Sequence, residues 1–499
     1  MPLEVSLSRL TAALPGADVR NPREAVVTKV TSDSRAVEPG TLFVATRGTR
    51  SDGHDFVGAA IERGASAVVV ERPLDTGAVP CAVVEDTAKA LAVIASEFYG
   101  NPSRDLRLFG VTGTNGKTST THLLKSILEA SSWGKVGLVG TIGHGTGSGA
   151  VEPSAHTTPE PVTLHRLFAE MKANGCAGVV MEVSSHAVKQ QRVWGVDFEI
   201  GMLTNVTRDH LDYHPTFEDY VGAKREFCDS LVSKDRRKKD GILAYSVDNE
   251  HSREIGEGFR GKKITVSAET AADVFATDVR ANLLGTRFVL NIAGRKSAEI
   301  NLKLLGLFSV SNAVLAAAGA HALDIEVDGI KAGLEAVGRV PGRFEAIGGG
   351  SRPHVIVDYS HTPDSLERTL LFCRALEPKR IIAVFGCGGD RDRGKRPLMG
   401  EIAQRIAHVC IVTSDNPRSE DPSKIIEDIL SGMDRKRPGL VVEADRRAAI
   451  FKAVSMARPG DVVAICGKGH EDYQIIGTKR YHFDDGEEAR KALEQWPTG

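Results

Sequence analysis

Short apolar runs alternate along the chain with segments whose apolar residues recur at the spacing of one helical face. Residues 106–111 form one such run, and residues 123–128 then place leucine and isoleucine on a single helical face. The alternation returns toward the C-terminus, where helical segments separate the apolar runs 381–385, 410–413 and 462–466. This pattern is typical of a mostly parallel sheet that is covered by helices on both faces.

Turn-rich stretches divide the pattern into parts. Residues 99–103 contain Gly-Asn-Pro and residues 340–343 contain Pro-Gly, and both stretches have the composition of a boundary. Between residues 264 and 305 the period changes toward alternation, which predicts a β-rich excursion. We therefore predict an α/β chain of three domains: a smaller N-terminal α/β domain at 1–104, a central domain with a mostly parallel sheet flanked by helices at 105–339, and a C-terminal Rossmann-like α/β domain at 340–499.

Composition and charge narrow the class of protein. The 499 residues are 41% hydrophobic, which is enough to build several cores. There are 63 Lys and Arg against 65 Asp and Glu, a net charge of −2, so the chain has no global basic field for nucleic acid. It shows no apolar signal region at its start and no apolar stretch of about 18 residues. We expect a cytoplasmic protein with no membrane insertion and no nucleic-acid partner.

Seven cysteines are scattered along the chain without a Cys-x-x-Cys pair. This spacing argues against zinc ribbons and against a disulfide framework. We expect reduced thiols that are mostly buried.

A glycine-rich turn with a lysine follows the strand predicted at residues 106–111. Residues 110–120 read Gly-Val-Thr-Gly-Thr-Asn-Gly-Lys-Thr-Ser-Thr. Glycines let backbone N–H groups approach phosphate oxygens, and the start of the following helix adds partial positive charge. Lys117 can reach terminal phosphates and Thr118 can ligate Mg²⁺, although a usual P-loop has glycine where Val111 stands. The central domain is therefore expected to be of the P-loop type, with nucleotide-binding residues Gly113, Thr114, Asn115, Gly116, Lys117, Thr118 and Ser119.

Polar clusters follow five predicted strands at the point where each strand ends. They occupy residues 182–186, 204–210, 386–393, 414–418 and 467–472. Open α/β sheets bind their ligands at the carboxyl ends of the strands. The sequence therefore predicts a site built from several strand ends.

Nine short motifs follow one another in a specific order along essentially the whole chain. They are T-S-D-S-R, G-T-N-G-K-T, H-T-T-P, E-V-S-S-H, T-N-V-T-R-D-H, Y-V-G-A-K, G-C-G-G-D-R-D, D-N-P-R and G-K-G-H-E-D-Y. Each motif alone is a weak signal, but the ordered set is specific. The set resembles the Mur ligases of peptidoglycan synthesis, and among them the members that add diaminopimelate.

The resemblance implies an ADP-forming, ATP-dependent amide ligase that adds meso-2,6-diaminopimelate to UDP-N-acetylmuramoyl-L-alanyl-D-glutamate. The N-terminal domain would bind the UDP part of the substrate, the central domain ATP, and the C-terminal domain the amino acid. A carboxylate and an amine need a leaving group to form an amide at neutral pH, so the γ-phosphoryl group of ATP would first give an acyl phosphate. These three small molecules are the expected partners, and the enzyme is expected to be a monomer.

The resemblance also implies the catalytic residues Lys117, Glu182, His210 and Lys224. Thr118 and Glu182 would hold Mg²⁺ between the β- and γ-phosphates, and His210 would help a second Mg²⁺. Lys224 matches the family lysine that CO₂ carbamylates, which turns a cation into an anion with oxygen ligands for that metal. From its spacing alone, Lys224 reads as a solvent-facing lysine on a helix. Asn312 is the candidate contact on the adenine side.

Further positions match the family's site for the nucleotide-sugar peptide. Hydroxyls and amides can pair with uracil, sugar and pyrophosphate, and Arg192 can bind phosphate or carboxylate through two hydrogen bonds. His156 and Ser309 depart from the pattern, because relatives often carry Asn at these places. The expected residues are Ser32, Ser34, Thr49, Arg50, Ser51, Thr157, Thr158, Ser184, Gln190 and Arg192.

Specificity for the added amino acid is expected to rest on D-N-P-R. Diaminopimelate has a distal carboxylate that lysine lacks, and the Arg418 guanidinium can bind a carboxylate through two hydrogen bonds. In the family, this arginine accompanies diaminopimelate. Glu471 suits an ammonium, and the full expected set is Arg391, Asp415, Asn416, Pro417, Arg418, Gly467 and Glu471.

Three alternatives from other classes stay open at this point. A folylpolyglutamate synthetase shares the ligase chemistry and the phosphate loop but should lack the N-terminal uridine domain. A P-loop kinase or regulatory NTPase would leave E-V-S-S-H and D-N-P-R unexplained. A binding protein that uses ATP as a switch would have no need of Lys117, Glu182, His210 and Lys224.

Overall fold

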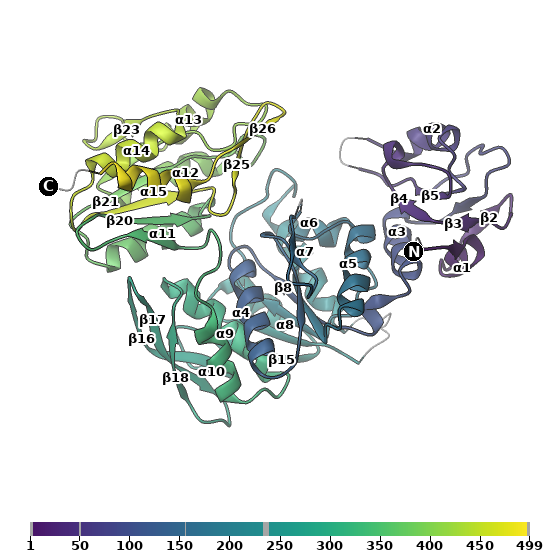
Figure 1. Ribbon diagram of the computed structural model, residues 1–499, viewed down its shortest axis with the longest axis horizontal. Helices are drawn as coiled ribbons and strands as arrows, with labels where there is room; N and C mark the ends of the chain where they lie inside the picture. The colour runs from purple at the N-terminus through teal and green to yellow at the C-terminus, as the bar shows by residue number, and fades with distance from the viewer. Residues whose placement is uncertain (1–2, 49–50, 155, 233–238, 497–499) are drawn as a thin grey trace.

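Three large sheets, each with its own helices, follow one another along the chain, and the described residues also form two two-stranded sheets, β1-β3 (Val5–Ser6 and Val26–Val27) and β25-β26 (Tyr473–Ile476 and Lys479–His482) (Figure 1). The computed structural model describes residues 3–48, 51–154, 156–232 and 239–496. The sheets form three lobes, and the central lobe lies between the other two. The predicted three-part α/β organisation is confirmed, while the limits placed after residues 104 and 339 stay predictions.

The N-terminal lobe is small. Its elements are β1 (Val5–Ser6), α1 (Leu7–Ala12), β2 (Asp18–Arg20), β3 (Val26–Val27), β4 (Lys29–Thr31), η1 (Ser34–Ala36), β5 (Thr41–Val44), η2 (Gly53–Phe56), α2 (Val57–Glu62), β6 (Ala67–Val70), β7 (Cys81–Val83) and α3 (Thr87–Phe98). The main sheet has the order β2-β7-β6-β5-β4, and only β2 runs antiparallel to its neighbour. Successive residues of β5 and β6 join different buried clusters, so apolar side chains pack on both faces.

The central lobe holds the largest sheet. Its elements are η3 (Pro102–Arg104), β8 (Arg107–Thr112), α4 (Lys117–Ala130), β9 (Val136–Val139), β10 (His144–Gly145), β11 (Val151–Glu152), α5 (Pro161–Ala173), β12 (Gly178–Glu182), α6 (Ser185–Lys189), β13 (Ile200–Leu203), α7 (Phe217–Ser230), β14 (Ile242–Ser246), α8 (Glu250–Gly258), β15 (Lys262–Ser267), β16 (Val274–Asn282), β17 (Gly285–Ile292), β18 (Ala298–Leu302), α9 (Leu307–His321) and α10 (Val327–Ala336). The order is β11-β10-β9-β12-β8-β13-β14-β15-β16-β17-β18.

The central sheet is mixed. Strands β9, β12, β8, β13, β14, β15 and β16 are parallel, as the alternation of strands and helices predicts. Both edges are antiparallel, because β10 and β11 extend one side and β17 and β18 the other. The second edge contains the β-rich excursion predicted between residues 264 and 305.

The C-terminal lobe repeats the α/β arrangement. Its elements are β19 (Glu345–Gly348), β20 (His354–Asp358), α11 (Pro363–Ala375), β21 (Ile381–Phe385), α12 (Lys395–Ile406), β22 (Val409–Val412), α13 (Pro422–Leu430), β23 (Leu440–Val442), α14 (Arg446–Met456), β24 (Val462–Cys466), β25 (Tyr473–Ile476), β26 (Lys479–His482) and α15 (Asp485–Glu494). The sheet order is β19-β20-β24-β21-β22-β23, and only β19 is antiparallel to its neighbour.

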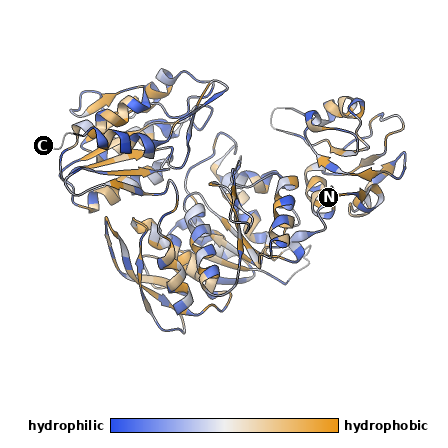
Figure 2. Ribbon diagram, in the orientation of Figure 1, coloured by the Kyte–Doolittle hydropathy of each residue, from blue (hydrophilic) through white to orange (hydrophobic). Residues whose placement is uncertain are grey.

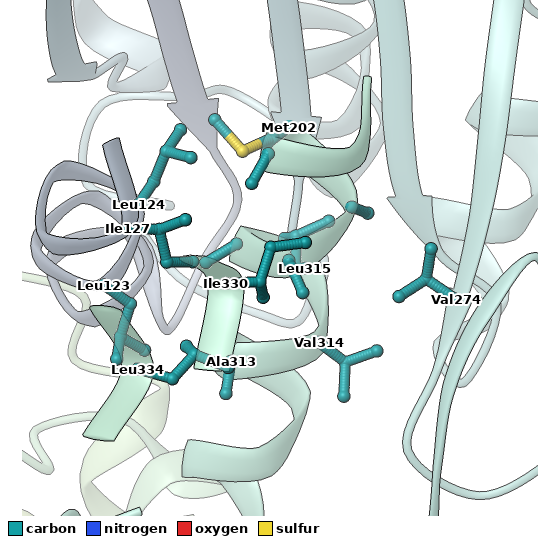
Figure 3. Packing of buried hydrophobic residues seen from close by; sticks show 14 of the residues in the cluster. Leu123, Leu124, Ile127, Met202, Val274, Ala313, Val314, Leu315, Ile330 and Leu334 are labelled. Carbon is teal, nitrogen blue, oxygen red and sulfur yellow. The ribbon is translucent and has the colours of Figure 1, made fainter. Parts of the chain in front are cut away.

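Helix α4 is held firmly against the core of the central lobe. Leu124 and Ile127 of α4 belong to one buried cluster with Ile330 of α10 (Figure 3). A β-carbon on Gly333 would lie 2.3 Å from the Ile127 Cα, so the two helix backbones approach as closely as glycine permits. This packing positions the N-terminus of α4, which follows the glycine-rich turn.

Apolar residues lie inside the lobes as the sequence pattern requires. In Figure 2 the strands are mostly orange, and blue residues mark the outer faces of the helices. All seven cysteines are free and buried, as expected. Over the described ranges, none of the helices has both the length and the apolar character needed to span a bilayer.

Candidate active site

The glycine-rich turn joins the end of β8 to the start of α4, as predicted. A β-carbon on Gly113 would lie 1.8 Å from Thr204 Oγ1, and one on Gly116 would lie 2.2 Å from Asn312 Oδ1. Both glycines also have positive φ angles, +141° and +88°. The loop therefore accepts only glycine at these two places, and Asn312 of α9 lies beside it.

Lys117 and Thr118 open helix α4. The Lys117 ammonium donates to the carbonyl oxygens of Gly113 and Thr114, both at 2.9 Å, so it lies over the phosphate loop. Burial lowers the pKa of Lys117. The Thr118 hydroxyl accepts a hydrogen bond of 3.0 Å from the Arg343 guanidinium.

Arg343 is a residue that the sequence reasoning missed. It belongs to the Val-Pro-Gly-Arg stretch that was interpreted only as a boundary. Its guanidinium lies 4.5 Å from the centroid of the Tyr359 ring, and its Nε is buried without a hydrogen-bond partner. A half-buried cation beside a phosphate loop is suited to a polyanion.

A pocket opens between the phosphate loop and the C-terminal lobe. The Asn115 amide donates to Asp364 at the start of α11 over 2.9 Å, which links the two lobes directly. Ser311 and Asn312 of α9 contribute a third wall. The lining residues are Asn115, Gly116, Thr118, Ser119, Asn205, Phe308, Ser311, Asn312, Arg343, Asp358, Tyr359, Ser360, His361, Ser365, Arg368 and Thr369.

Glu182 ends β12, the strand next to β8. Its side chain is buried, and its two oxygens accept hydrogen bonds from the backbone and hydroxyl of Thr141 at 2.8 and 3.0 Å. Across the part of the chain that the structure describes, no ion pair neutralises this carboxylate. A buried carboxylate near a threonine hydroxyl is a donor set that fits Mg²⁺.

Lys224 is buried among aromatic rings, and His210 lies at the accessible side of the same aromatic cluster, with 36% of its side chain exposed. The His210 ring is 4.8 Å from that of His186, and burial lowers the pKa of His210 to about 3, which leaves a neutral imidazole. Lys224 of α7 is 1% exposed, with its ammonium 4.3 Å from the centroid of the Tyr220 ring.

The environment of Lys224 favours an uncharged amine. Burial, and secondarily the charge of Lys117, hold the pKa of Lys224 well below its usual range. The expectation of a solvent-facing lysine, drawn from spacing alone, is therefore wrong. No cluster of three or more His, Cys, Asp or Glu side chains suited to a metal occurs among the described residues, so the predicted metal set depends also on Thr118 and a modified Lys224.

Five residues predicted for the nucleotide-sugar peptide gather between β12 and α6. Thr157 approaches the Thr141 hydroxyl at 3.0 Å, and Thr158 donates to the Glu182 carbonyl at 2.9 Å. Arg192 donates to the Thr158 carbonyl at 2.8 Å and to Gln190 at 3.0 Å. Ser184 caps α6 by accepting from the Ala187 N–H.

The remaining residues of that prediction belong to the N-terminal lobe. Ser32 and Ser34 follow β4, and the Ser51 carbonyl accepts from Gly48 at 2.9 Å. Hydrogen bonds and ion pairs within the described ranges do not connect these three serines to the cluster around Arg192. Thr49 and Arg50 lie outside the described residues.

Residues predicted for the amino acid converge in the C-terminal lobe. Asp415 and Asn416 follow β22 and are buried, and the Asn416 amide donates to Glu471 at 2.7 Å. Arg418 donates to the Gly389 carbonyl at 2.7 Å, and the Pro417 carbonyl packs against Gly389. A β-carbon on Gly467 would lie 2.6 Å from Asp415 Oδ2.

The pKa values of the two carboxylates in this cluster, Asp415 and Glu471, shift in opposite directions. Burial and the neighbouring Asp415 raise the pKa of Glu471. Burial also opposes ionisation of Asp415, but Lys468, Arg446 and Arg418 outweigh it and lower the pKa of Asp415. Lys468 is the second residue that sequence reasoning missed, although its motif was recognised.

Arg391 is the one predicted amino-acid contact that reaches the central lobe. Its guanidinium lies 3.8 Å from Asp212, and its side chain is 47% exposed. A second pair, Arg208–Asp392, joins the same loops at 3.4 Å. The loop after β13 in the central lobe and the loop after β21 in the C-terminal lobe therefore face each other.

The fold and the site define a nucleotide-dependent ligase of three α/β domains. Family models match the chain as "Mur ligase family, catalytic domain" at residues 26–99, "Mur ligase middle domain" at 111–320 and "Mur ligase, glutamate ligase domain" at 342–469. The chain belongs to the Mur ligase family of ATP-dependent enzymes.

Individual relatives agree over nearly the full length. The UDP-N-acetylmuramoyl-L-alanyl-D-glutamate–2,6-diaminopimelate ligase of Aquifex aeolicus is 45% identical over 469 residues, 93% of each chain. The enzyme of that name from Geobacillus thermodenitrificans is 42% identical over 493 residues, 98% of this chain and 100% of the relative. A solved structure of a ligase of that name has a TM-score of 0.65 and 32% identity, and the match covers 94% of this chain and 95% of that one. The match at residues 26–99 argues against the folylpolyglutamate alternative.

Proposed function

We propose that this chain joins meso-2,6-diaminopimelate to UDP-N-acetylmuramoyl-L-alanyl-D-glutamate, with ATP as co-substrate and an acyl phosphate as intermediate. The observation that carries the proposal is a series of contacts between the lobes. Arg418 of D-N-P-R donates to Gly389, and the loop that contains Gly389 pairs with the loop after β13. Asn205, in that same loop after β13, accepts a hydrogen bond from the Asn115 N–H of the phosphate loop. The function of a kinase or of an ATP-dependent switch would not require the D-N-P-R cluster. The names of the relatives support the same reaction.

The phosphate loop and two cationic side chains would bind the phosphates. Backbone N–H groups at the start of α4 and the ammonium of Lys117 would bind the β- and γ-phosphates of ATP. Arg343, next to Thr118, would add a guanidinium to the same polyanion. The adenosine would lie in the pocket lined by Asn312 and Tyr359. These groups stabilise the charge that develops as the phosphoryl group moves to the glutamyl carboxylate.

Thr118 and Glu182 are the residues that would hold Mg²⁺. The fit rests on the buried Glu182 carboxylate, which has no cationic partner within the described ranges. Mg²⁺ supplies positive charge to the phosphoryl oxygens when it is bound. We propose that His210 and a carbamylated Lys224 serve a second ion. The neutral amine that the buried site favours is the form that can add CO₂.

Two sets of residues would orient the substrates. The nucleotide-sugar peptide would be bound by Thr157, Thr158, Ser184, Gln190 and Arg192, together with Ser32, Ser34 and residues 49–51. Arg391, Asp415, Asn416, Pro417, Arg418, Gly467 and Glu471 would bind the amino acid, with Arg418 on the distal carboxylate and Glu471 on an ammonium. Closing the lobes over both would exclude water from the acyl phosphate.

A direct assay tests the proposal. The protein is mixed with ATP, Mg²⁺ and the UDP-linked dipeptide, and ADP release is measured with diaminopimelate, with lysine and with no amino acid. We expect ADP release only with an acceptor, and much faster release with diaminopimelate. ADP release that does not depend on an amino acid would support a kinase or NTPase instead.

Arg418→Ala is expected to remove most of the preference for diaminopimelate over lysine. The change leaves the distal carboxylate unpaired in a partly desolvated pocket, at a cost of about 2–5 kcal/mol in kcat/KM for diaminopimelate. Lysine has no such carboxylate and should lose far less, so the ratio of the two kcat/KM values falls. Arg418→Lys should restore only part of the ratio, because an ammonium keeps the charge without the paired hydrogen bonds.

Arg393→Ala is the matched control for Arg418→Ala. Arg393 lies in the same lobe, is 68% exposed and pairs with Asp428 at 3.0 Å, outside the amino-acid cluster. Its removal should leave the ratio unchanged. An equal loss for both amino acids in Arg418→Ala would show that Arg418 only supports the turn, through its bond to Gly389.

A further inference from the structure

A fully buried lysine lies among the residues proposed to bind the amino acid. Lys468 is 0% exposed. Its ammonium lies 3.2 Å from Asn416 Oδ1, 3.2 Å from Glu471 Oε2 and 3.8 Å from Asp415 Oδ1. A side chain buried to this degree does not contact a ligand in this arrangement. Any influence of Lys468 on the amino acid must pass through these three neighbours.

Lys468 sets the orientation of the Asn416 amide. Asn416 Oδ1 accepts from the Lys468 ammonium and from the Ile475 N–H at 2.9 Å. Asn416 Nδ2 then donates to Glu471 Oε2 at 2.7 Å. The lysine ammonium and the Ile475 N–H can only donate hydrogen bonds, so together they select the oxygen side of the amide and turn the nitrogen toward Glu471.

The charges around Lys468 leave the cluster with an excess of one carboxylate. Arg446 is already neutralised, because it binds both oxygens of Asp485 at 2.7 and 2.6 Å and both side chains are fully buried. Arg418 also acts on Asp415, but the proposed function assigns its charge to the distal carboxylate of the amino acid, so Asp415 and Glu471 share the single charge of Lys468. The remaining negative charge is the complement of one ammonium group.

We propose that Lys468 is the positioning residue of the amino-acid pocket: it orients Asn416 and Glu471 and balances one of two buried carboxylates, so that the pocket accepts a single substrate ammonium. The inference rests on the proposed function, in which this cluster binds diaminopimelate. It assigns to Lys468 a role in substrate affinity and none in the transfer of the phosphoryl group.

Lys468→Met removes the charge and keeps the length of the side chain. Loss of hydrogen bonds to a charged group should raise the KM for diaminopimelate about ten- to hundredfold. We expect changes of less than about threefold in kcat at saturating amino acid and in the KM values for ATP and the UDP-linked dipeptide. The variant loses binding energy for diaminopimelate that is equal in the ground state and the transition state, so only the KM for diaminopimelate should rise. Arg380→Met is the control, since it breaks a pair with the buried Asp461 of the same lobe and should affect stability without affecting any KM.

A double variant separates positioning from general support of the fold. If Lys468 acts through Glu471, Lys468→Met should add less than about threefold to the KM of Glu471→Gln, because residues in one network are not additive. The double variant removes one positive and one negative charge, so the net charge of the cluster stays that of the unmodified protein. It should therefore fold even if Lys468→Met does not. The proposal would be overturned if the rise in KM for diaminopimelate in the double variant equals the product of the two single rises. It would also be overturned if Lys468→Met lowers kcat and raises all three KM values together.

A crystal structure of Lys468→Met without substrates tests the positioning role independently of activity. We expect the Glu471 carboxylate to move away from Asn416, because it loses the ammonium at 3.2 Å while the Ile475 N–H still holds Asn416 Oδ1. An unchanged pair would overturn the inference. Absence of ADP release with diaminopimelate in the unmodified protein would instead refute the proposed function, and the crystal structure would still decide the role of Lys468.

Discussion

Lys117→Ala is expected to fold normally and to lose turnover by about 10³-fold or more, because a charge that acts on the developing transition state is removed from a buried site. In the structure the Lys117 ammonium lies over the loop carbonyls of Gly113 and Thr114, where phosphate oxygens would replace or join them. The measurement is the rate of amino-acid-dependent ADP release at saturating substrates. Circular dichroism and a thermal melt would establish that the variant is folded.

Lys125→Ala provides the control for Lys117→Ala on the same helix. Lys125 lies on α4 and forms a surface pair with Glu129 at 2.6 Å. Its removal should leave turnover close to that of the unmodified protein, since surface pairs contribute little. Turnover near the unmodified level in Lys117→Ala would contradict the assignment of residues 113–119 as the phosphate loop.

Lys224→Ala is expected to be nearly inactive and to recover in part when short carboxylates such as acetate are added. The carboxylate would supply the two oxygens that a carbamate places near His210. Lys224→Arg keeps a positive charge but should be equally inactive. A guanidinium is not carbamylated, and it is larger than the buried site around Tyr220. Arg225→Ala, at the exposed neighbouring position of α7, should retain activity.

The carbamate can also be observed directly. Intact protein at high bicarbonate should show a mass increment of one CO₂ that is absent from Lys224→Ala. Crystals of active protein should show additional density at the Lys224 Nζ. A bare amine in well-ordered, active crystals, or equal rescue of Lys117→Ala by acetate, would contradict a carbamate at this position.

Much of the fold follows from local patterns. The strand, turn and helix around residues 106–128 have strong local signals: an apolar run, obligatory glycines and one apolar helical face. The same holds for the repeated strands of the C-terminal lobe. The antiparallel edge β10–β11 was harder to predict than the β17–β18 edge, because two-residue strands carry almost no period and edge pairing depends on which strand remains free.

The burial of Lys224 shows where local reasoning fails. Spacing on α7 favours a solvent-facing lysine, whereas the structure buries it against Tyr220 and close to the charge of Lys117. Lysine side chains are exposed to water in most positions of most proteins, but this is a statistical tendency. Here the packing of α7 beside the strand ends buries Lys224. Only the resemblance to the Mur ligases pointed to a functional lysine at this position.

The sequence by itself determined the three-part α/β organisation, the phosphate loop and the set of strand ends that carry polar residues, because each of these depends on residues that are neighbours along the chain. Tertiary structure decided which of those strand ends meet. The bonds Arg343 to Thr118 and Asn115 to Asp364 join residues of different lobes, and Lys468 is buried against the end of another strand. Such contacts depend on strand order and on how the lobes pack, and the free energy of burying a charge exists only once that packing has removed the water around it.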